Sequence, residues 1–359
     1  MRQKKIFFNY ATVGPLNKKA FKAVKKFLDE FVKIGPPQIL EKYDQYFYLL
    51  TREASRLLHC NPEEIVFTKN TTEGIIIASE TLPLSADDEI LLVENEYPAN
   101  LLPWLKKKKD GVIVKVVRGS DNQEAFKNLL KSITPKTRAV SVSWGQYYDG
   151  FMPDMELLSE TCRKNNTFLV VDAVHRVGAR QIDLSKIHID FLACGGQKHI
   201  GALPGTGFLY VNNKTLNKLK NFKVGIRSVR HFDSNGYTLK GSAERFLDGT
   251  QNLAGLVSLV YAIKDINEQG ISKIEKKNLS LLKSFKKILC ENNLPFVDYM
   301  DQANILSLKV QNSEALDKYL RSKNIYIKAV KGVARISFSH TSSIKNFKTL
   351  IQSIKKSPN

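Results

Sequence analysis

Short runs of apolar and β-branched residues alternate with amphipathic stretches between residues 45 and 211 of this 359-residue chain. Such runs predict strands buried in a parallel sheet, because they have no polar side to present to water. The stretches between them have the period of helices. This alternation predicts a doubly wound α/β sheet with helices on both faces. The predicted strands are Ile65–Thr68, Glu89–Val93, Ile113–Val117, Ala139–Ser143, Phe168–Asp172, Phe191–Cys194 and Gly207–Val211.

The pattern changes after about Leu253, where two long helices are expected, followed by short strands and helices. We therefore predict a large α/β domain at residues 16–253 and a smaller α+β domain formed by residues 1–15 and 254–359. Helices are predicted at 18–33, Gln45–Leu58, Thr72–Leu82, Asn122–Lys131, Met155–Asn165, 254–269 and 272–292. The later elements of the smaller domain are predicted at Ile305–Val310, Ser313–Ser322, Ile325–Lys328, Ala334–Ser339 and Ile344–Lys355.

The chain is strongly basic, with 55 Lys and Arg against 35 Asp and Glu and a formal net charge of +20. Binding of nucleic acid would need basic residues gathered on one element, with aromatic side chains to stack bases. Only Lys106–Lys109 forms a run, and the other lysines are scattered through predicted helices. A lysine-rich solvated surface is therefore favoured over nucleic-acid binding. A positive field that attracts an anionic substrate or cofactor is the functional alternative.

No segment is predicted to enter a membrane or to serve as a secretion signal. No run reaches the ~18 to 20 apolar residues of a membrane span, and Asn9, Gly14 and Pro15 interrupt the apolar start too early for a signal peptide. We expect a cytoplasmic protein with reduced cysteines and no metal site. Neither a C-x-x-C pair nor a histidine at metal-ligand spacing accompanies the four cysteines, which are Cys60, Cys162, Cys194 and Cys290.

The most informative pair of polar residues is Asp172 and Lys198. Asp172 ends a predicted strand, and Lys198 lies 26 positions later (198 − 172) in a glycine-rich turn after the next strand. In open α/β sheets the ligand binds outside the carboxyl ends of the strands. Pyridoxal phosphate requires two polar contacts of this kind, a lysine that forms a Schiff base and a carboxylate that keeps the pyridinium nitrogen protonated.

Three motifs carry a resemblance to a known family. They are Asp172–His175, which reads Asp-Ala-Val-His, then Lys198, then Gly205–Tyr210, which reads Gly-Thr-Gly-Phe-Leu-Tyr. In this order and spacing they resemble the class V aminotransferase family of fold-type-I pyridoxal-phosphate enzymes, which also contains the cysteine desulfurases, over nearly the whole chain. The resemblance implies pyridoxal 5′-phosphate as cofactor and a mixed, mostly parallel seven-stranded sheet in the large domain. It also implies a smaller α+β C-terminal domain.

The resemblance places the cofactor's phosphate at Thr71 and Thr72, which follow the first strand and open a helix. A helix N-terminus offers unpaired N–H groups and a favourable dipole end to phosphate. The alternative is that Thr71 and Glu73 only cap the helix. The family uses the matching Thr-Thr-Glu turn as its phosphate cradle, so we expect both roles together.

Tyr97 lies in ENEYPANLLPW, which is similar to the family's Glu-His-His-Ala-Asn-x-x-Pro-Trp, and matches the histidine that stacks on the cofactor ring. An aromatic ring can cover the cofactor in the same way, although a packing role at a strand end is the alternative. The family places donors to the cofactor's ring hydroxyl at the positions of Gln146 and His175. An isolated histidine is more often structural. Only the place of His175 in the motif Asp172–His175 favours its role as a donor to the ring hydroxyl.

The turn before Lys198 departs from the family. Many desulfurases have Ser-Gly-His-Lys, whereas this chain has Gly195-Gly196-Gln197-Lys198. One phosphate donor is lost, although Gln197 can still donate; His199 is expected to be structural. Thr250 resembles the family's Gly-Thr-x-Asn turn, which reaches the phosphate of the partner subunit. The resemblance therefore implies a homodimer with shared active sites.

Arg335, in ARISFSHTSS, matches the family's arginine for the substrate α-carboxylate. A guanidinium suits this role because it can bind a carboxylate with two parallel hydrogen bonds. A surface arginine on a strand of the small domain is the alternative. Arg227, Arg230 and His231 lie in a loop after the sheet and are candidates to select an acidic or phosphorylated side chain.

The residues around Arg335 bear on the reaction. Cysteine desulfurases have a mobile cysteine shortly before this arginine, and NIYIKAVKGVARIS contains none, while Cys290 is too far back. We therefore predict transamination of an amino acid or amino-bearing metabolite, with Lys198 as the base at Cα and Asp172 and His175 as the other catalytic residues. β-Elimination of a desulfurase-like kind and epimerisation remain the alternatives. A non-catalytic scaffold would be expected to lack Lys198 or Asp172.

Overall fold

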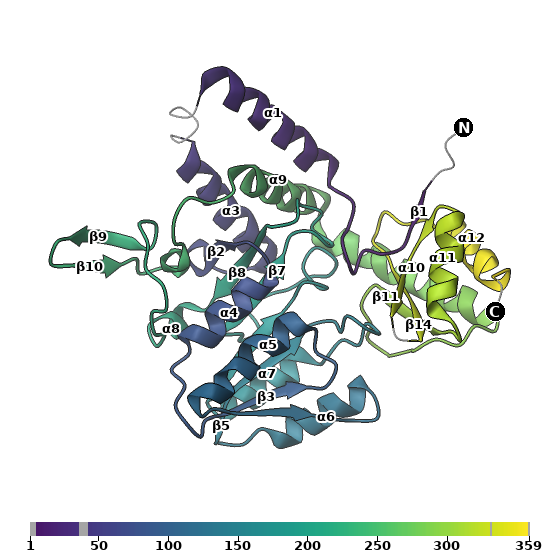
Figure 1. Ribbon diagram of the computed structural model, residues 1–359, viewed down its shortest axis with the longest axis horizontal. Helices are drawn as coiled ribbons and strands as arrows, with labels where there is room; N and C mark the ends of the chain where they lie inside the picture. The colour runs from purple at the N-terminus through teal and green to yellow at the C-terminus, as the bar shows by residue number, and fades with distance from the viewer. Residues whose placement is uncertain (1–4, 36–41, 331, 358–359) are drawn as a thin grey trace.

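The computed structural model describes residues 5–35, 42–330 and 332–357. Its centre is a seven-stranded sheet in the order β2-β8-β7-β6-β5-β3-β4 (Figure 1). All seven predicted runs are strands, and the mixed, mostly parallel sheet is confirmed. The strands are β2 (Ile65–Thr68), β3 (Glu89–Val93), β4 (Ile113–Val117), β5 (Thr137–Ser143), β6 (Phe168–Asp172), β7 (Phe191–Gly195) and β8 (Gly207–Val211).

Two strands differ from the expectation of buried parallel strands. β8 runs antiparallel to both neighbours, β2 and β7, because the turn between β7 and β8 is too short to contain a crossover helix. β4 lies at the edge of the sheet, and its Ile113 and Val116 are 43% and 39% exposed. By contrast, β3, β6, β7 and β8 are buried at every residue, as expected for strands covered by helices on both faces.

The helices of the large domain follow the predicted positions closely. α1, α3 and α9 pack against one another, and α4 packs on the centre of the sheet. Two helices, α5 and the short α8, were not predicted. The elements are α1 (Lys18–Ile34), α3 (Tyr43–Leu58), α4 (Thr71–Thr81), α5 (Pro98–Lys107), α6 (Asn122–Ser132), α7 (Met155–Lys164), α8 (Asn213–Leu216) and α9 (Leu253–Gln269), with short 3₁₀ turns at Pro62–Glu64, Lys108–Asp110 and Ala243–Phe246.

Two hydrophobic clusters divide the apolar core. The first surrounds the sheet and includes α9, so this helix packs with the large domain although the predicted boundary lies at residue 254. The second joins the C-terminal elements to Phe8 of the N-terminal segment. The division into two domains stays a prediction. The C-terminal elements are α10 (Ile271–Glu291), β11 (Ile305–Lys309), α11 (Ser313–Ser322), β12 (Ile325–Tyr326), β13 (Lys328–Val330), β14 (Val333–Ser337) and α12 (Ile344–Lys355).

The N-terminal segment connects the two clusters. Figure 1 shows it passing from α1 to the C-terminal elements, where β1 (Ile6–Phe7) pairs parallel with β12. β11, β14 and β13 form a separate antiparallel sheet. The predicted strand Ile325–Lys328 is therefore divided between two sheets, because β12 pairs with β1 and β13 pairs with β14.

The loop that contains Arg227, Arg230 and His231 is in part a hairpin of β9 (Val229–Asp233) and β10 (Gly236–Leu239). It projects away from the sheet (Figure 1). Its residues are mostly exposed, including Phe232 at 59% and Tyr237 at 53%. A two-stranded hairpin is only marginally stable without further packing.

Candidate active site

The predicted site residues meet at the carboxyl ends of the central parallel strands. Thr71 follows β2, Tyr97 follows β3, Gln146 follows β5, Asp172 ends β6 and Lys198 follows β7. The order of the strands brings them together because parallel strands end at the same edge of a sheet.

Lys198 is the predicted reactive amine of the site. Its Nζ lies 3.2 Å from His175 Nε2. Burial lowers the pKa of Lys198 to about 8, and burial also lowers the pKa of His175 well below its ordinary value. A neutral imidazole therefore faces an amine that can lose its proton near neutral pH, which is the nucleophilic form.

Asp172 is a buried carboxylate, 4% exposed, that accepts a hydrogen bond from the backbone N–H of Val174 at 3.0 Å. Burial raises its pKa, and the nearby charge of Lys198 opposes that rise. Within the described residues Asp172 forms no ion pair. Because Lys198 lies beyond ion-pair distance and a buried carboxylate is costly unless a cation pairs with it directly, this position is suited to a protonated ring nitrogen.

The predicted phosphate end of the site lies at the start of α4. Asn70 caps this helix by accepting from the backbone N–H of Glu73, and Glu73 accepts from that of Lys69. The Thr71 hydroxyl instead accepts from the backbone N–H of Gly195 at 2.9 Å. Thr71 is therefore not the cap, and its hydroxyl hydrogen and the N–H groups of Thr71 and Thr72 remain available to an anion.

The glycine that replaces the family's serine has a structural reason. A Cβ at Gly195 would lie 2.5 Å from Gln197 Oε1 and 3.2 Å from Thr71 Oγ1. Gln197 and Thr71 thus occupy the space that a serine side chain would enter. The role of Gln197 as a phosphate donor stays a prediction.

Tyr97 lies at the mouth of the site. It is 48% exposed, and its ring centre is 5.9 Å from Lys198 Nζ and 5.2 Å from the ring of Tyr147. The exposed ring beside the lysine is consistent with a stacking role, which stays a prediction.

Glu96 is a site residue that the sequence analysis missed. It is 5% exposed and accepts hydrogen bonds from the backbone N–H of Ser143 at 2.8 Å and from Gln146 Nε2 at 3.0 Å. Burial raises its pKa to about 7. The carboxyl group joins the ends of β3 and β5 and orients Gln146. Its position next to Tyr97 in the sequence was the available signal.

Arg335 is buried on β14 and only 5% exposed, so the alternative of a surface arginine is wrong. Nη1 donates to the carbonyl of Tyr147 at 2.9 Å and Nη2 donates to Thr12 Oγ1 at 2.8 Å. Burial lowers its pKa to about 10. No carboxylate pairs with this guanidinium in the described part of the chain, so its charge is available to an anion.

Other predicted residues lie apart from this group. Thr250 is exposed and lies shortly before α9. Arg227 pairs with Asp44 at 2.6 Å, and Arg230 and His231 lie on the projecting β9. His199 is stacked against Tyr10, as expected for a structural role.

Several buried polar atoms at the site have no hydrogen-bond partner within the described residues. They include a ring nitrogen of His175, a side-chain oxygen of Gln146 and of Gln197, and Nε of Arg335. A ligand with a ring nitrogen, a hydroxyl and a phosphate fits the surrounding Asp172, donor groups and α4 N-terminus. The residues present therefore fit pyridoxal phosphate. In the same described residues no group of three or more His, Cys, Asp or Glu side chains could hold a metal ion.

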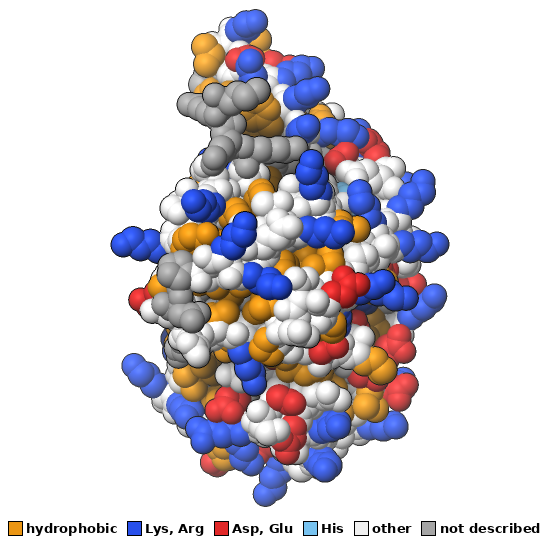
Figure 2. All heavy atoms as spheres, turned by 90° about the vertical axis from the view of Figure 1, so that its right-hand side faces the viewer, with side chains coloured by type: hydrophobic (Ala, Val, Ile, Leu, Met, Phe, Trp, Pro, Cys, Tyr) orange, Lys and Arg blue, Asp and Glu red, His pale blue; other side chains and the backbone are white. Residues whose placement is uncertain are grey.

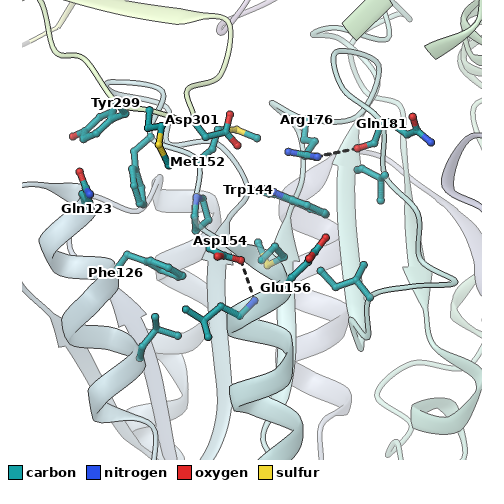
Figure 3. A pocket seen from close by; sticks show the side chains of 18 of the residues that line it. Gln123, Phe126, Trp144, Met152, Asp154, Glu156, Arg176, Gln181, Tyr299 and Asp301 are labelled. Atoms are coloured by element: carbon teal, nitrogen blue, oxygen red, sulfur yellow. Dashed lines mark hydrogen bonds between the residues drawn. The ribbon is translucent and has the colours of Figure 1, made fainter. Parts of the chain in front are cut away.

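A separate cavity of about 610 Å³ lies beside α6, α7 and the segment 299–301 (Figure 3). The guanidinium of Arg176 lies 4.3 Å from the ring centre of Trp144 and donates to the carbonyl of Gln181 at 3.0 Å. None of the predicted site residues lines this cavity.

The surface is consistent with the scattered charge of the sequence. Figure 2 shows Lys and Arg side chains spread over one face, separated by apolar atoms and by Asp and Glu. Among the helices that the structure describes, none combines the length and the hydrophobicity needed to span a bilayer. The four cysteines are all free.

Comparison with known proteins gives a consistent result. A family profile described as Aminotransferase class-V matches residues 44–349. A "Probable cysteine desulfurase" of Methanothermobacter thermautotrophicus is 28% identical over 265 residues, covering 72% of this chain and 66% of that protein. One of Ureaplasma parvum is 29% identical over 290 residues, covering 79% and 72%. The solved complex of the cystine C–S lyase C-DES with cysteine persulfide has a TM-score of 0.92 at 20% identity and covers 99% of both chains, which shows the fold.

Proposed function

Because the chain belongs to the class V aminotransferase family of pyridoxal-phosphate enzymes, we propose that it is a lyase that cleaves the Cβ–S bond of a sulfur-containing amino acid. The sequence analysis put transamination first and elimination second. The order is reversed here because relatives that match 72%, 82% and 79% of the chain are named probable cysteine desulfurases, whereas a relative that matches 98% of it is named only as an uncharacterized aminotransferase. This observation carries the choice of reaction, and the geometry of Lys198 and Arg335 supports an amino-acid substrate.

The positions of the cysteines favour release of the sulfur over its transfer to the protein. Cys194 is fully buried on β7 and Cys162 is buried in α7. Burial raises the pKa of both thiols, which disfavours the nucleophilic thiolate. Cys60 follows α3, and Cys290 lies near the end of α10. No described contact brings either of these two to Lys198.

The chain's own groups can carry out the elimination. Arg335 binds the α-carboxylate, and the neutral amine of Lys198 takes the Cα proton while His175 holds that amine. When bound, pyridoxal phosphate supplies the electron sink for the charge that develops at Cα. The sulfur group leaves with the electron pair of the Cβ–S bond. Water then hydrolyses the resulting enamine to pyruvate and ammonia.

Product analysis tests the proposal. The cofactor-supplied protein is incubated with L-cystine or L-cysteine, and pyruvate, ammonia, sulfane sulfur, sulfide and alanine are measured with and without a 2-oxo acid. We expect pyruvate and ammonia in equal amounts, with release of reduced sulfur or persulfide, independent of the 2-oxo acid. Alanine together with a protein-bound persulfide would indicate a desulfurase. Product formation only with the 2-oxo acid would restore transamination.

We also propose a homodimer with shared active sites. Thr250 is exposed, and the nearby β9–β10 hairpin presents exposed apolar side chains, a feature of interaction surfaces. The test is complementation between Lys198→Ala and Thr250→Ala proteins, mixed after reversible dissociation. A mixed dimer contains one site with both native residues, so activity should return. No recovery, with dimers shown to exchange, would contradict shared sites.

A further inference from the structure

The hydroxyl of Thr12 holds Arg335 from the exposed side of the site. Thr12 Oγ1 accepts from Arg335 Nη2 at 2.8 Å and donates to Asn9 Oδ1 at 2.8 Å. Asn9 Oδ1 also lies 3.5 Å from Arg335 Nη2. On the other side of the guanidinium, Nη1 donates to the carbonyl of Tyr147. The plane of the guanidinium is therefore fixed by two segments that are far apart in the sequence.

The segment that carries Thr12 is itself held at both ends. The backbone N–H of Ala11 donates to Ser337 Oγ at 2.9 Å, which attaches it to β14. The N–H of Gly14 donates to the carbonyl of Gln197 at 2.7 Å, which attaches it to the Lys198 turn. A Cβ at Gly14 would lie 2.3 Å from the carbonyl oxygen of Lys198, so only glycine permits this close approach. Residues 9–14 thus connect the arginine with the lysine.

The chemistry of the contacts to Arg335 indicates that its guanidinium recognises an anionic ligand. Within the described residues, the hydrogen-bond partners of the Arg335 guanidinium are all neutral oxygen atoms, namely a hydroxyl, a carboxamide oxygen and a backbone carbonyl. Neutral acceptors orient a guanidinium without cancelling its charge, whereas a carboxylate at the same place would compete with an anionic ligand. A buried cation held in this way is prepared to bind an anion.

We propose that Thr12 is a positioning residue that aims Arg335 at the α-carboxylate and so lets the site distinguish an amino acid from the corresponding amine. This inference rests on the proposed role of Arg335. It assigns to the N-terminal segment a part in substrate specificity as well as in packing.

The test compares two ligands that differ only in the carboxylate. L-Alanine and ethylamine lack a β leaving group, so neither can undergo the elimination, and their binding to the cofactor-loaded, full-length protein is titrated by the change in visible absorbance. Thr12→Val removes the hydroxyl at nearly constant shape. We expect the Kd for L-alanine to rise about tenfold, as for loss of one hydrogen bond to a charged group, and the Kd for ethylamine to change less than twofold.

Two further variants make the result specific. Thr12→Ser retains the hydroxyl and should keep both dissociation constants within twofold of the native values. Thr12→Asp should weaken L-alanine binding more than Thr12→Val, because it neutralises the guanidinium. An equal loss for both ligands, or no change in Thr12→Val, would overturn the role of Thr12. If the native protein bound both ligands equally, the result would contradict the proposed role of Arg335 itself, on which the role of Thr12 depends.

Discussion

Lys198, which is partly buried, and Arg335, which is buried, are two cations supplied by different regions of the molecule. Lys198 follows a strand of the central sheet, whereas Arg335 belongs to the C-terminal sheet. Within the described residues neither forms an ion pair, yet burial lowers the pKa of Lys198 to about 8 and that of Arg335 only to about 10. The lysine can therefore lose its proton near neutral pH while the arginine stays charged. These pKa values suit Lys198 to the proposed proton transfer and Arg335 to the proposed binding of a carboxylate.

The largest expected effect comes from removing the amine. Lys198→Ala should lower the rate of pyruvate formation by at least about 10³-fold, because both the covalent attachment and the base are lost. Borohydride treatment followed by peptide mass analysis should locate the fixed cofactor on Lys198 in the native protein and find none in the variant. Attachment to another lysine in the native protein would contradict the assignment.

Removing the positive charge of Arg335 should affect substrate binding more than turnover. Arg335→Met should raise KM for the amino acid about 10- to 100-fold, which corresponds to loss of a charged hydrogen bond, and change kcat only a few-fold. Arg335→Lys is the matched control, since it keeps the charge but loses the planar two-point geometry. A kcat that fell as much as kcat/KM would place Arg335 among the groups that act in the chemical step.

The pH dependence of pyridoxal phosphate uptake should depend on Lys198 and not on Arg335. The neutral amine of Lys198 is the reactive form, so the rate of pyridoxal phosphate incorporation into the apoprotein should rise about tenfold per pH unit and level off near the pKa of about 8. The rise should persist in Arg335→Met. A rate independent of pH from 6 to 8 would contradict the lowered pKa of Lys198.

The smallest expected effect is on the free energy of unfolding and comes from the buried carboxyl group of Glu96. The folded-state pKa of Glu96 is about 7, above its ordinary value of 4.5, so the folded protein binds more protons than the unfolded chain between these values. The free energy of unfolding should therefore fall as pH rises through this window, by at most about 1.4 kcal/mol per pH unit from this group. Glu96→Gln should remove this contribution, as urea denaturation at pH 5, 6 and 7 can measure. Parallel curves for both proteins would show that Glu96 does not titrate there.

The strands of the central sheet were predictable because each is a short apolar run, and such a run can be recognised from the local sequence alone. The direction of β8 was not, since it depends on the short connection from β7. The β9–β10 hairpin had a turn signal at Asn235-Gly236, but its polar and exposed strands lack the apolar run used for the others. Glu96 was missed for a related reason, because its buried state arises from β5 residues distant in the sequence.

The sequence by itself determined the order of strands and helices and the spacing of Asp172, Lys198 and Arg335, because these depend on periodicity and on motifs within short stretches. Only the tertiary structure decided which of these groups are buried, which lack a counter-charge and which neutral atoms hold them. The contact between Thr12 and Arg335 joins residues 323 positions apart. Burial and contacts of this range set the pKa values and the orientation of the site, and no local pattern in the chain records them.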